Sequence, residues 1–402
     1  MSYFSERLDA FPRIAPYRMA KDAGYWPYYK TVQSASEPRI KIAGKEAINF
    51  GSNNYLSLSY HPGVVEATIA ATRKFGSGVT GSRLLNGTLD LHKELESELA
   101  DFYGTESALV FSTGYVSNLS AIAGFLGKKD YAVADKEIHN SLLTGIQLSG
   151  SVMKRFRHND IEHLEKILTS LPEQVGKGVV VDGVYSMSGD TAPLAEMAKL
   201  CRSIPNTFLL DDEAHGLGVL GERGLGAAEH YGVLDEIDLF TITFSKTLGS
   251  CGGALMGPAD AIELLTLTSD TLIFTASNTP GSVAAALAAL RILVAEPERP
   301  AQLRANVSQF VSMLHERNVP TSPVESAIIT IPLKRFDEVS TVLLAGDLLD
   351  RGVFVNPVLP PAVTKDAGLI RLSLMVDHGP EILEEAADIM AKVLLDHEQI
   401  LN

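Results

Sequence analysis

The chain has 402 residues, of which 46% are hydrophobic and 21% charged, so it is long enough for roughly two or three structural units and too apolar to be a disordered protein. Its formal charge of −15, without a long basic run, argues against nucleic acid or an anionic lipid surface as a partner. We expect no signal peptide, because the first residues carry charges and a proline, and no membrane-spanning segment, because Arg291 interrupts the most apolar helical run. Two cysteines, Cys201 and Cys251, are too few for a disulfide framework, and this favours a cytoplasmic protein. We expect Cys251 to be a small buried thiol.

Residues 1–55 have a mixed pattern and are expected to form an N-terminal segment. Residues 56–290 begin with helical spacing over 61–75 and 89–103, and then short apolar runs alternate with helical ones. The apolar runs are 107–112, 131–135, 152–156, 178–185, 208–214, 239–244 and 252–257. This alternation predicts a large α/β domain with a mostly parallel sheet covered by helices.

Residues 291–402 follow a different pattern, with longer helical stretches between fewer apolar runs. Helices are predicted over 302–317, 336–352 and a terminal stretch ending near Leu401, and strands over 327–333, 354–361 and 369–376. We therefore expect a smaller C-terminal α+β domain.

Two short motifs suggest nucleotide chemistry, but their context argues against it. GSGVTG (76–81) fits the dinucleotide pattern GxGxxG, yet it follows a helical stretch instead of a buried strand. DEAH (212–215) also occurs in nucleic-acid helicases, which need a phosphate loop of the form GxxxxGK[ST], and this sequence has none.

A metal site is not expected either. Asp211, Asp212 and Glu213 are consecutive on a predicted strand, so their side chains alternate between its two faces and cannot all converge with His215. His158 and His163 lack a further ligand at metal-binding spacing, and we expect them to be solvated or satisfied within the core.

A lysine in TFSKTLGSCGG (243–253) indicates covalent chemistry. Lys246 lies between an apolar strand and a glycine-rich turn, where burial can remove its proton and make the amine a nucleophile for a Schiff base. An ordinary surface lysine is an equally good interpretation of this segment alone. Thr243 and Ser245, just before it, can donate hydrogen bonds to a phosphate.

Three further segments would complete a site for pyridoxal phosphate (PLP). Asp212 ends a predicted strand, where its carboxylate can point into the crevice of an open sheet and keep a pyridine nitrogen protonated. FSTGYVSN (111–118) reads as strand, glycine and helix, and the free N–H groups of such a helix start can bind phosphate. His139 can stack on an aromatic ring, or it can simply be a histidine at a helix start that bonds to the backbone.

Several such motifs in order resemble the α-oxoamine synthase family of fold-type I PLP enzymes, and the resemblance covers nearly the whole chain. The stretches that carry it are GSNNYLSLSYHP, GSRLLNGTLDLHKELE, FSTGYVSNLSAI, FRHNDIEHLE, GVYSMSGDTAPL, LDDEAHGLGVLGERG, TFSKTLGSCGG, IFTAS and IRLSLMVDH. The resemblance implies the fold-type I PLP transferase fold and a homodimer with active sites shared at the subunit interface. It also implies a decarboxylative Claisen condensation of an amino acid with an acyl thioester carried by CoA or by a carrier protein.

The resemblance also implies residue roles. Lys246 would hold PLP as a Schiff base, Asp212 would pair with the pyridine nitrogen, and His139 would stack over the ring. The remaining implied contacts are His215 to the ring hydroxyl; Gly114, Tyr115, Thr243 and Ser245 to the phosphate; Thr275 and Ala276 to the phosphate from the partner subunit; Ser186 in the cofactor pocket; and Arg371 and Asn53 for the amino acid, with Arg371 on its carboxylate.

Within the family, the stretches LLNGT, FRHND and IFTAS resemble members that join L-serine to a long-chain acyl-CoA and make an α-amino ketone such as 3-ketosphinganine. The glycine in DEAHG is similar to members that join alanine to a pimeloyl thioester. We expect L-serine to be the amino-acid substrate. The alternative is the reaction with alanine, and the non-enzymatic alternative is an inactive scaffold of the same fold. Many relatives have an arginine immediately before a Pro-Pro pair, whereas Leu359 precedes Pro360 and Pro361 here, so a second carboxylate contact is missing.

Overall fold

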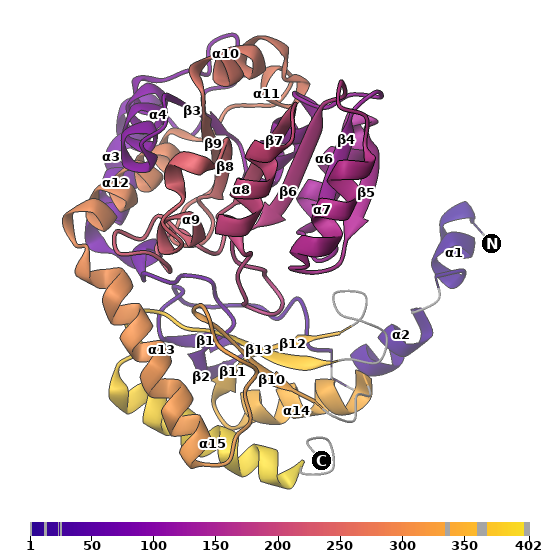
Figure 1. The fold of residues 1–402 in the computed structure, drawn as a ribbon. Helices are drawn as coiled ribbons and strands as arrows, with labels where there is room; N and C mark the ends of the chain where they lie inside the picture. The colour runs from indigo at the N-terminus through magenta and orange to yellow at the C-terminus, as the bar shows by residue number, and fades with distance from the viewer. Residues whose placement is uncertain are drawn as a thin grey trace.

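The computed structural model describes residues 2–11, 14–22, 24, 26–333, 338–359 and 368–397. In these ranges a seven-stranded sheet forms the centre of the larger part, and two three-stranded sheets lie in the smaller part below it (Figure 1). The short helices α1 (Tyr3–Asp9) and α2 (Ile14–Asp22) stand to one side of the body in this view.

The central sheet has the strand order β3-β9-β8-β7-β6-β4-β5. Only β9 runs antiparallel to its neighbours, so the mostly parallel sheet predicted from the sequence is confirmed. The strands are β3 (Ser107–Phe111), β4 (Tyr131–Asp135), β5 (Val152–Phe156), β6 (Lys177–Asp182), β7 (Thr207–Asp212), β8 (Leu239–Thr243) and β9 (Gly253–Gly257). Strand β6 is buried along its whole length, as expected for a parallel strand with helices on both faces.

Helices cover both faces of this sheet and divide its core into two layers. One layer packs under α5 (Gly114–Ala123), α6 (Asn140–Ser149), α10 (Ala259–Thr268) and α11 (Asp270–Ile273). The other packs under α4 (Asp90–Tyr103), α7 (Ile161–Ser170), α8 (Leu194–Ser203) and α9 (Ala227–His230) and continues without a break into the smaller part. Helices α3 (Pro62–Phe75) and α12 (Pro280–Ala295) pack on each other beside α4.

The smaller part combines segments from both ends of the chain. One of its sheets joins β1 (Arg39–Ile42) and β2 (Lys45–Asn49) to β11 (Val353–Phe354), and the other has the order β10-β13-β12. The remaining elements are β10 (Ile328–Pro332), β12 (Asn356–Val358), β13 (Leu369–Ser373), α13 (Glu298–Glu316), α14 (Glu338–Asp350), α15 (Pro380–Asp396) and the 3-10 turns η1 (Leu58–Tyr60) and η2 (Leu234–Glu236). The predicted end near Leu401 lies outside the described residues.

Helix α12 runs through residue 290, and α12 and α13 meet at 81°. We therefore propose that the boundary between the large and the C-terminal domain, predicted at 290, is best drawn at this bend. None of the described helices is alone long and apolar enough to cross a membrane, and α12 and α13 reach that length and composition only as a bent pair.

Candidate active site

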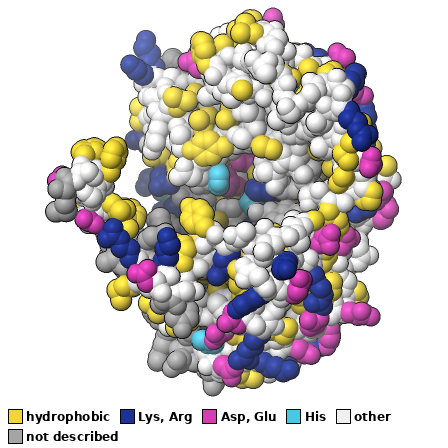
Figure 2. Space-filling view, turned by 180° about the vertical axis from the view of Figure 1, so that it is seen from behind, with side chains coloured by type: hydrophobic (Ala, Val, Ile, Leu, Met, Phe, Trp, Pro, Cys, Tyr) yellow, Lys and Arg dark blue, Asp and Glu magenta, His cyan; other side chains and the backbone are white. Residues whose placement is uncertain are grey.

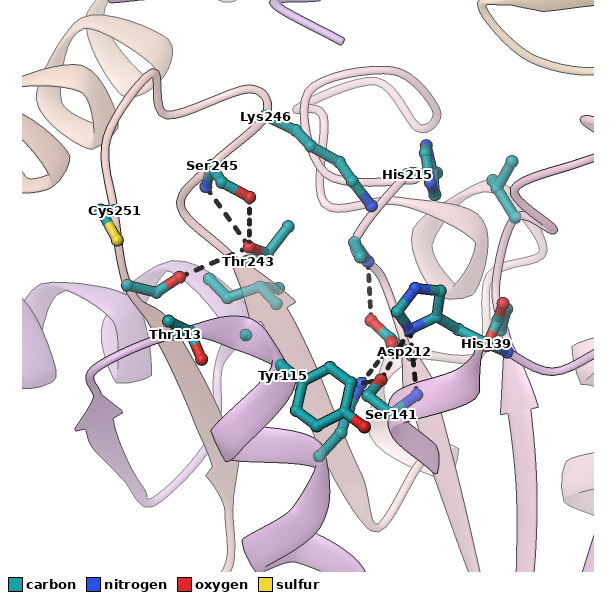
Figure 3. Close-up of a pocket in the computed structure, with 17 residues that line it drawn as sticks. Thr113, Tyr115, His139, Ser141, Asp212, His215, Thr243, Ser245, Lys246 and Cys251 are labelled. Carbon is teal, nitrogen blue, oxygen red and sulfur yellow. Dashed lines mark hydrogen bonds between the residues drawn. The ribbon is translucent and has the colours of Figure 1, made fainter. Parts of the chain in front are cut away.

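A pocket of about 260 Å³ lies where the parallel strands of the central sheet end. Because the carboxyl ends of parallel strands meet at one edge, residues that are distant in the sequence converge there. In the space-filling view, histidine, acidic and basic side chains lie in a hollow between the two parts of the molecule (Figure 2). Lys246 reaches toward His139, Asp212 and His215, while Thr243 and Cys251 lie on the other side (Figure 3).

Lys246 follows β8 and has the electrostatics of a reactive amine. Burial lowers its pKa from 10.5 to about 8, although the nearby carboxyl groups of Asp212 and Asp182 oppose the shift. Among the described residues, no side chain accepts a hydrogen bond from its Nζ at bonding distance. An amine with this pKa is partly neutral near pH 7 and is able to attack a carbonyl carbon.

Asp212 ends β7 with only 4% of its surface exposed, and its two oxygens are held by different donors. Asn118 Nδ2 on α5 lies 2.6 Å from Oδ2, and the backbone N–H of Ala214 donates to Oδ1 at 3.0 Å. On the neighbouring strand, Asp182 also faces the pocket, and burial together with the charge of Asp212 raises its pKa well above the usual range. Both effects favour the neutral, protonated form of Asp182.

The next carboxyl groups along β7 face away from the pocket, as the strand alternation predicts. Asp211 and Glu213 both point at the space beside Gly183, on the opposite face of the sheet from Asp212. Burial raises the pKa of Asp211 well above its usual value and that of Glu213 to about 7. At least one of them holds a proton, so the strand end does not gather repelling charges behind Asp212.

His139 is both a helix-start histidine and a pocket residue. It caps α6 by accepting from the backbone N–H of Ser141, and its Nδ1 lies 2.7 Å from the Ser141 hydroxyl. The Ser141 oxygen in turn accepts from Asn118 Nδ2 at 2.9 Å, so its proton is free to be donated to His139. Burial lowers the pKa of His139, and a neutral ring with Nδ1 as acceptor carries its proton on Nε2.

His215 also lines the pocket, and its ring is neutral as well. Burial, followed by the positive charges of Lys246 and Arg371, lowers its pKa well below the usual value. Its Nδ1 lies 2.7 Å from the hydroxyl of Tyr55. This contact fixes the ring plane and leaves Nε2 for a ligand.

The far side of the pocket is a cradle for an anion. Thr113 caps the ten-residue helix α5 by accepting from Val116 N–H, which turns the helix start toward the hydroxyl groups of Thr243 and Ser245. A Cβ added to Gly114 would lie 2.6 Å from the Cβ of Thr243, so only glycine allows strand and helix to approach this closely. Free helix N–H groups and two hydroxyls suit a phosphate.

A second cluster lies next to His215 and contains a buried cation. Arg371 on β13, 5% exposed, places Nη1 and Nη2 each 3.2 Å from Asn53 Oδ1. The same Asn53 oxygen lies 3.0 Å from the Ser373 hydroxyl and 3.3 Å from that of Tyr55. Because Tyr55 also contacts His215, this cluster adjoins the pocket.

The structure brings together most of the predicted site residues but not all of them. Ser186 does not line the pocket, and its backbone oxygen instead accepts from Arg371 Nε at 2.7 Å. Thr275 and Ala276 also lie outside the pocket of their own subunit, next to the segment around Ser82. Leu359 is half-buried after β12, and the Pro-Pro pair that follows it lies outside the described residues.

Sequence reasoning missed several pocket residues. Asn118 and Ser141 act through contacts between helices that no sequence pattern reveals. Asp182 carried the same signal as Asp212, a carboxyl at the end of a buried strand, and could have been found.

The prediction that Cys251 is buried is wrong. Its side chain is exposed and lines the pocket, because β9 begins only at Gly253 and the turn before it is still at the pocket mouth.

These residues fit PLP. A buried carboxylate, an amine of lowered pKa and an anion cradle lie around one pocket, and Asn118 contributes a buried Oδ1 atom without a partner there. Lys246 would bind the aldehyde carbon, Asp212 the pyridine nitrogen and the start of α5 the phosphate. These groups are far apart in the sequence, since Asp212 ends β7, Lys246 follows β8 and the cradle lies at the start of α5, and the fold brings them to one pocket.

Comparisons with known proteins agree with this interpretation. Residues 45–390 match the family described as aminotransferase class I and II. A serine palmitoyltransferase of Sphingobacterium spiritivorum is 40% identical and covers 98% of this chain and 97% of its own length. A putative 8-amino-7-oxononanoate synthase of Trichodesmium erythraeum is 38% identical over 90% of this chain and 93% of its own length.

Solved structures agree as well. Serine palmitoyltransferase of Sphingomonas wittichii matches with a TM-score of 0.93 at 37% identity, covering 98% of this chain and 99% of its own. A serine palmitoyltransferase solved with PLP as the internal aldimine matches with the same TM-score at 35% identity and the same coverage. The chain therefore belongs to the aminotransferase class I and II family, and within it to the PLP-dependent α-oxoamine synthases that its motifs resemble.

Proposed function

We propose that this chain condenses L-serine with a long-chain acyl-CoA, with loss of carbon dioxide and CoA, to give an α-amino ketone such as 3-ketosphinganine. The observation that carries the proposal is the position of the buried Arg371–Asn53 cluster next to a pocket that fits PLP. The serine palmitoyltransferases that match nearly the whole chain support the choice of serine.

Each end of the proposed cofactor site has its own residues. Asp212 would hold the proton on the pyridine nitrogen, and PLP bound in this way would supply an electron sink for negative charge at the amino-acid α-carbon. Among the other residues that line the pocket, His139 would lie against the ring, His215 would present Nε2 to the ring hydroxyl, and the start of α5 with Thr243 and Ser245 would bind the phosphate. Tyr115 lines the same pocket beside the phosphate cradle.

Lys246 has two tasks in this proposal. Its Nζ would anchor PLP, and the same amine, when not bound to PLP, would take the proton from the α-carbon of the amino acid. The second task needs an amine that is neutral for part of the time at working pH, which a pKa of about 8 provides. A lysine in water, with its pKa near 10.4, would be almost fully protonated.

Arg371 and Asn53 would receive the carboxylate of the amino acid. The guanidinium is desolvated, and its fork matches a carboxylate in geometry and charge. Asn53 keeps the fork in place before the substrate arrives. Leu359 stands where many relatives have an arginine and cannot bind a carboxylate. Among the described residues, we therefore propose the Arg371–Asn53 cluster as the carboxylate site.

We also propose a homodimer with shared active sites. Leu85 and Phe274 are 80% and 81% exposed, and their two segments lie side by side through the bridge between Ser82 and Ala276. Apolar side chains this exposed favour burial against a partner surface. A second copy seated there would carry Thr275 and Ala276 toward the phosphate of its neighbour's site.

A cytoplasmic location is proposed because Cys201 and Cys251 are free thiols.

The alanine reaction has one sequence signal in its favour, the glycine after His215, and the Trichodesmium relative supports the same alternative. The structure gives that glycine another reason. A Cβ at Gly216 would lie 1.7 Å from Glu213 Oε2, so the buried Glu213 side chain would have to move to admit a larger residue here. Packing against Glu213 thus gives Gly216 a reason that is independent of the amino acid, and serine stays favoured.

A spectral titration of the PLP-loaded protein with L-serine, L-alanine, glycine and L-threonine tests the choice of amino acid. We expect serine to change the cofactor absorbance at the lowest concentration. Mass analysis after adding acyl-CoAs of different length should then give the serine product with one carbon dioxide lost. A response to alanine alone would overturn the proposal in favour of the alternative.

A further inference from the structure

His158 lies outside the pocket, between two carboxylates. Its Nδ1 is 2.9 Å from Asp135 Oδ1 and its Nε2 is 2.8 Å from Asp190 Oδ2. Carboxylates accept hydrogen bonds, so both ring nitrogens donate at once only when the ring is protonated. Burial lowers the pKa of His158, but the hydrogen bonds to Asp135 and Asp190 raise it to about 10. The side chain, 21% exposed, is therefore a fixed positive link between the two.

The two carboxylates belong to different pieces of the molecule. Asp135 ends β4 and is fully buried in the central sheet. Asp190 belongs to the loop of residues 184–191 that follows β6, and this loop folds back on itself because Tyr185 N–H donates to the Asp190 backbone oxygen at 2.9 Å. His158 thus ties the loop to the rigid edge of the sheet.

The same loop orients the proposed carboxylate-binding residue. The Ser186 backbone oxygen accepts from Arg371 Nε at 2.7 Å, which sets the plane of the guanidinium. The end of the loop is anchored to the smaller part, where Glu325 Oε2 accepts from the Thr191 N–H at 2.9 Å and from its hydroxyl at 2.7 Å. His158 and Glu325 thus hold neighbouring residues, Asp190 and Thr191, at the end of the loop, and the bond from Tyr185 N–H to the Asp190 oxygen carries this anchoring to the segment that bears the Ser186 carbonyl.

We propose that His158 is a positioning residue for recognition of the amino-acid carboxylate: it holds Asp190 against the sheet, and so fixes the loop carbonyl that aims Arg371. The inference rests on the proposed function, in which Arg371 receives that carboxylate. His158 is not among the residues that line the pocket, so its effect on the substrate is indirect.

The test uses the PLP-loaded protein and two ligands that differ in the carboxylate. His158→Ala should raise the Kd for L-serine about tenfold or more, because a small displacement of a binding group costs this much. The Kd for ethanolamine, which is serine without its carboxylate, should stay unchanged, as should the PLP content. His158→Arg, which keeps the charge and can donate to both carboxylates, should restore most of the serine affinity.

His163→Ala is the matched control. His163 lies in the same segment, and its Nδ1 accepts from the Arg157 backbone N–H, but it makes no bond to the 184–191 loop at hydrogen-bonding distance among the described residues. Its removal should leave both Kd values unchanged. If His158→Ala does not fold, Asp190→Asn, which removes the charge on the loop side at nearly constant shape, gives the same test.

The outcomes separate this inference from the proposed function. An unchanged serine Kd in His158→Ala, or an equal loss for serine and ethanolamine, would overturn the inference. Arg371→Ala is measured in parallel. If Arg371→Ala leaves serine binding intact, the proposed carboxylate site itself is wrong. If Arg371→Ala weakens serine binding and His158→Ala does not, only the positioning role is wrong.

Discussion

Replacing Asp212 by asparagine separates the charge at the end of β7 from its shape. The carboxylate accepts from Asn118 and from the Ala214 N–H, one donor on each oxygen. An amide can keep only one of these bonds, and its NH₂ group then meets the other donor. The loss of about one hydrogen bond predicts that the free energy of unfolding falls by about 1 kcal/mol, and about 3 kcal/mol at most. The protein should therefore fold.

Turnover should fall much further. An amide at position 212 cannot hold a proton on the pyridine nitrogen, so the charge-stabilising contact made in the transition state is lost. Losses of this kind are about 3–4 kcal/mol, or about 100- to 1,000-fold in rate. The assay is product formation from L-serine and palmitoyl-CoA, with urea unfolding and PLP content measured on the same preparation.

Asp211→Asn is the matched control for Asp212→Asn. Asp211 is the neighbouring residue on the same strand, faces away from the pocket, and has a pKa raised well above its usual value by burial and by Glu213, so its charge should matter little to turnover. If Asp212→Asn kept turnover within about threefold of the unaltered protein, the assignment of Asp212 to the pyridine nitrogen would be refuted.

Three further predictions concern the cofactor and the assembly. With a pKa of about 8, the Lys246 amine should be about 9% neutral at pH 7. The rate at which cofactor-free protein captures PLP should therefore rise with pH and level off above about pH 8. A rate that still rises tenfold per pH unit at pH 9 would contradict the lowered pKa. Gly114→Ala, whose Cβ would lie 2.6 Å from that of Thr243, should weaken PLP binding about tenfold, whereas Gly78→Ala, with nothing within 4 Å of its Cβ, should not. Leu85→Asp should shift sedimentation toward the monomer, and an unchanged sedimentation coefficient would place the subunit contact elsewhere.

The order of strands and helices was predictable because most strands of the central sheet are short apolar runs between turn signals, although β5 is largely exposed and carries Lys154 and Arg155. Lys246 and Asp212 were also predictable, because a residue at the end of a parallel strand lies at the ligand-binding edge whatever the rest of the fold does. The resemblance to a family supplied His215 and Arg371, which no local pattern marks.

What could not be predicted depends on contacts between distant segments. Ser186 was expected in the cofactor pocket from the resemblance, but the contact that it makes to Arg371 uses its backbone oxygen, which every residue has. His158 has no sequence neighbour that explains it, because Asp135 and Asp190 reach it from other parts of the chain.

The division of the site between two parts of the molecule has a consequence for how turnover cycles. The groups around the cofactor pocket come from residues 113–252, within the central sheet and its loops, whereas Asn53 and Arg371 belong to segments that pack with the smaller part. A small swing of one lobe against the other would loosen the grip on the amino acid and leave the coenzyme's cradle intact. With the proposed roles of these residues, such a swing would allow the amino acid to exchange while the coenzyme stays bound.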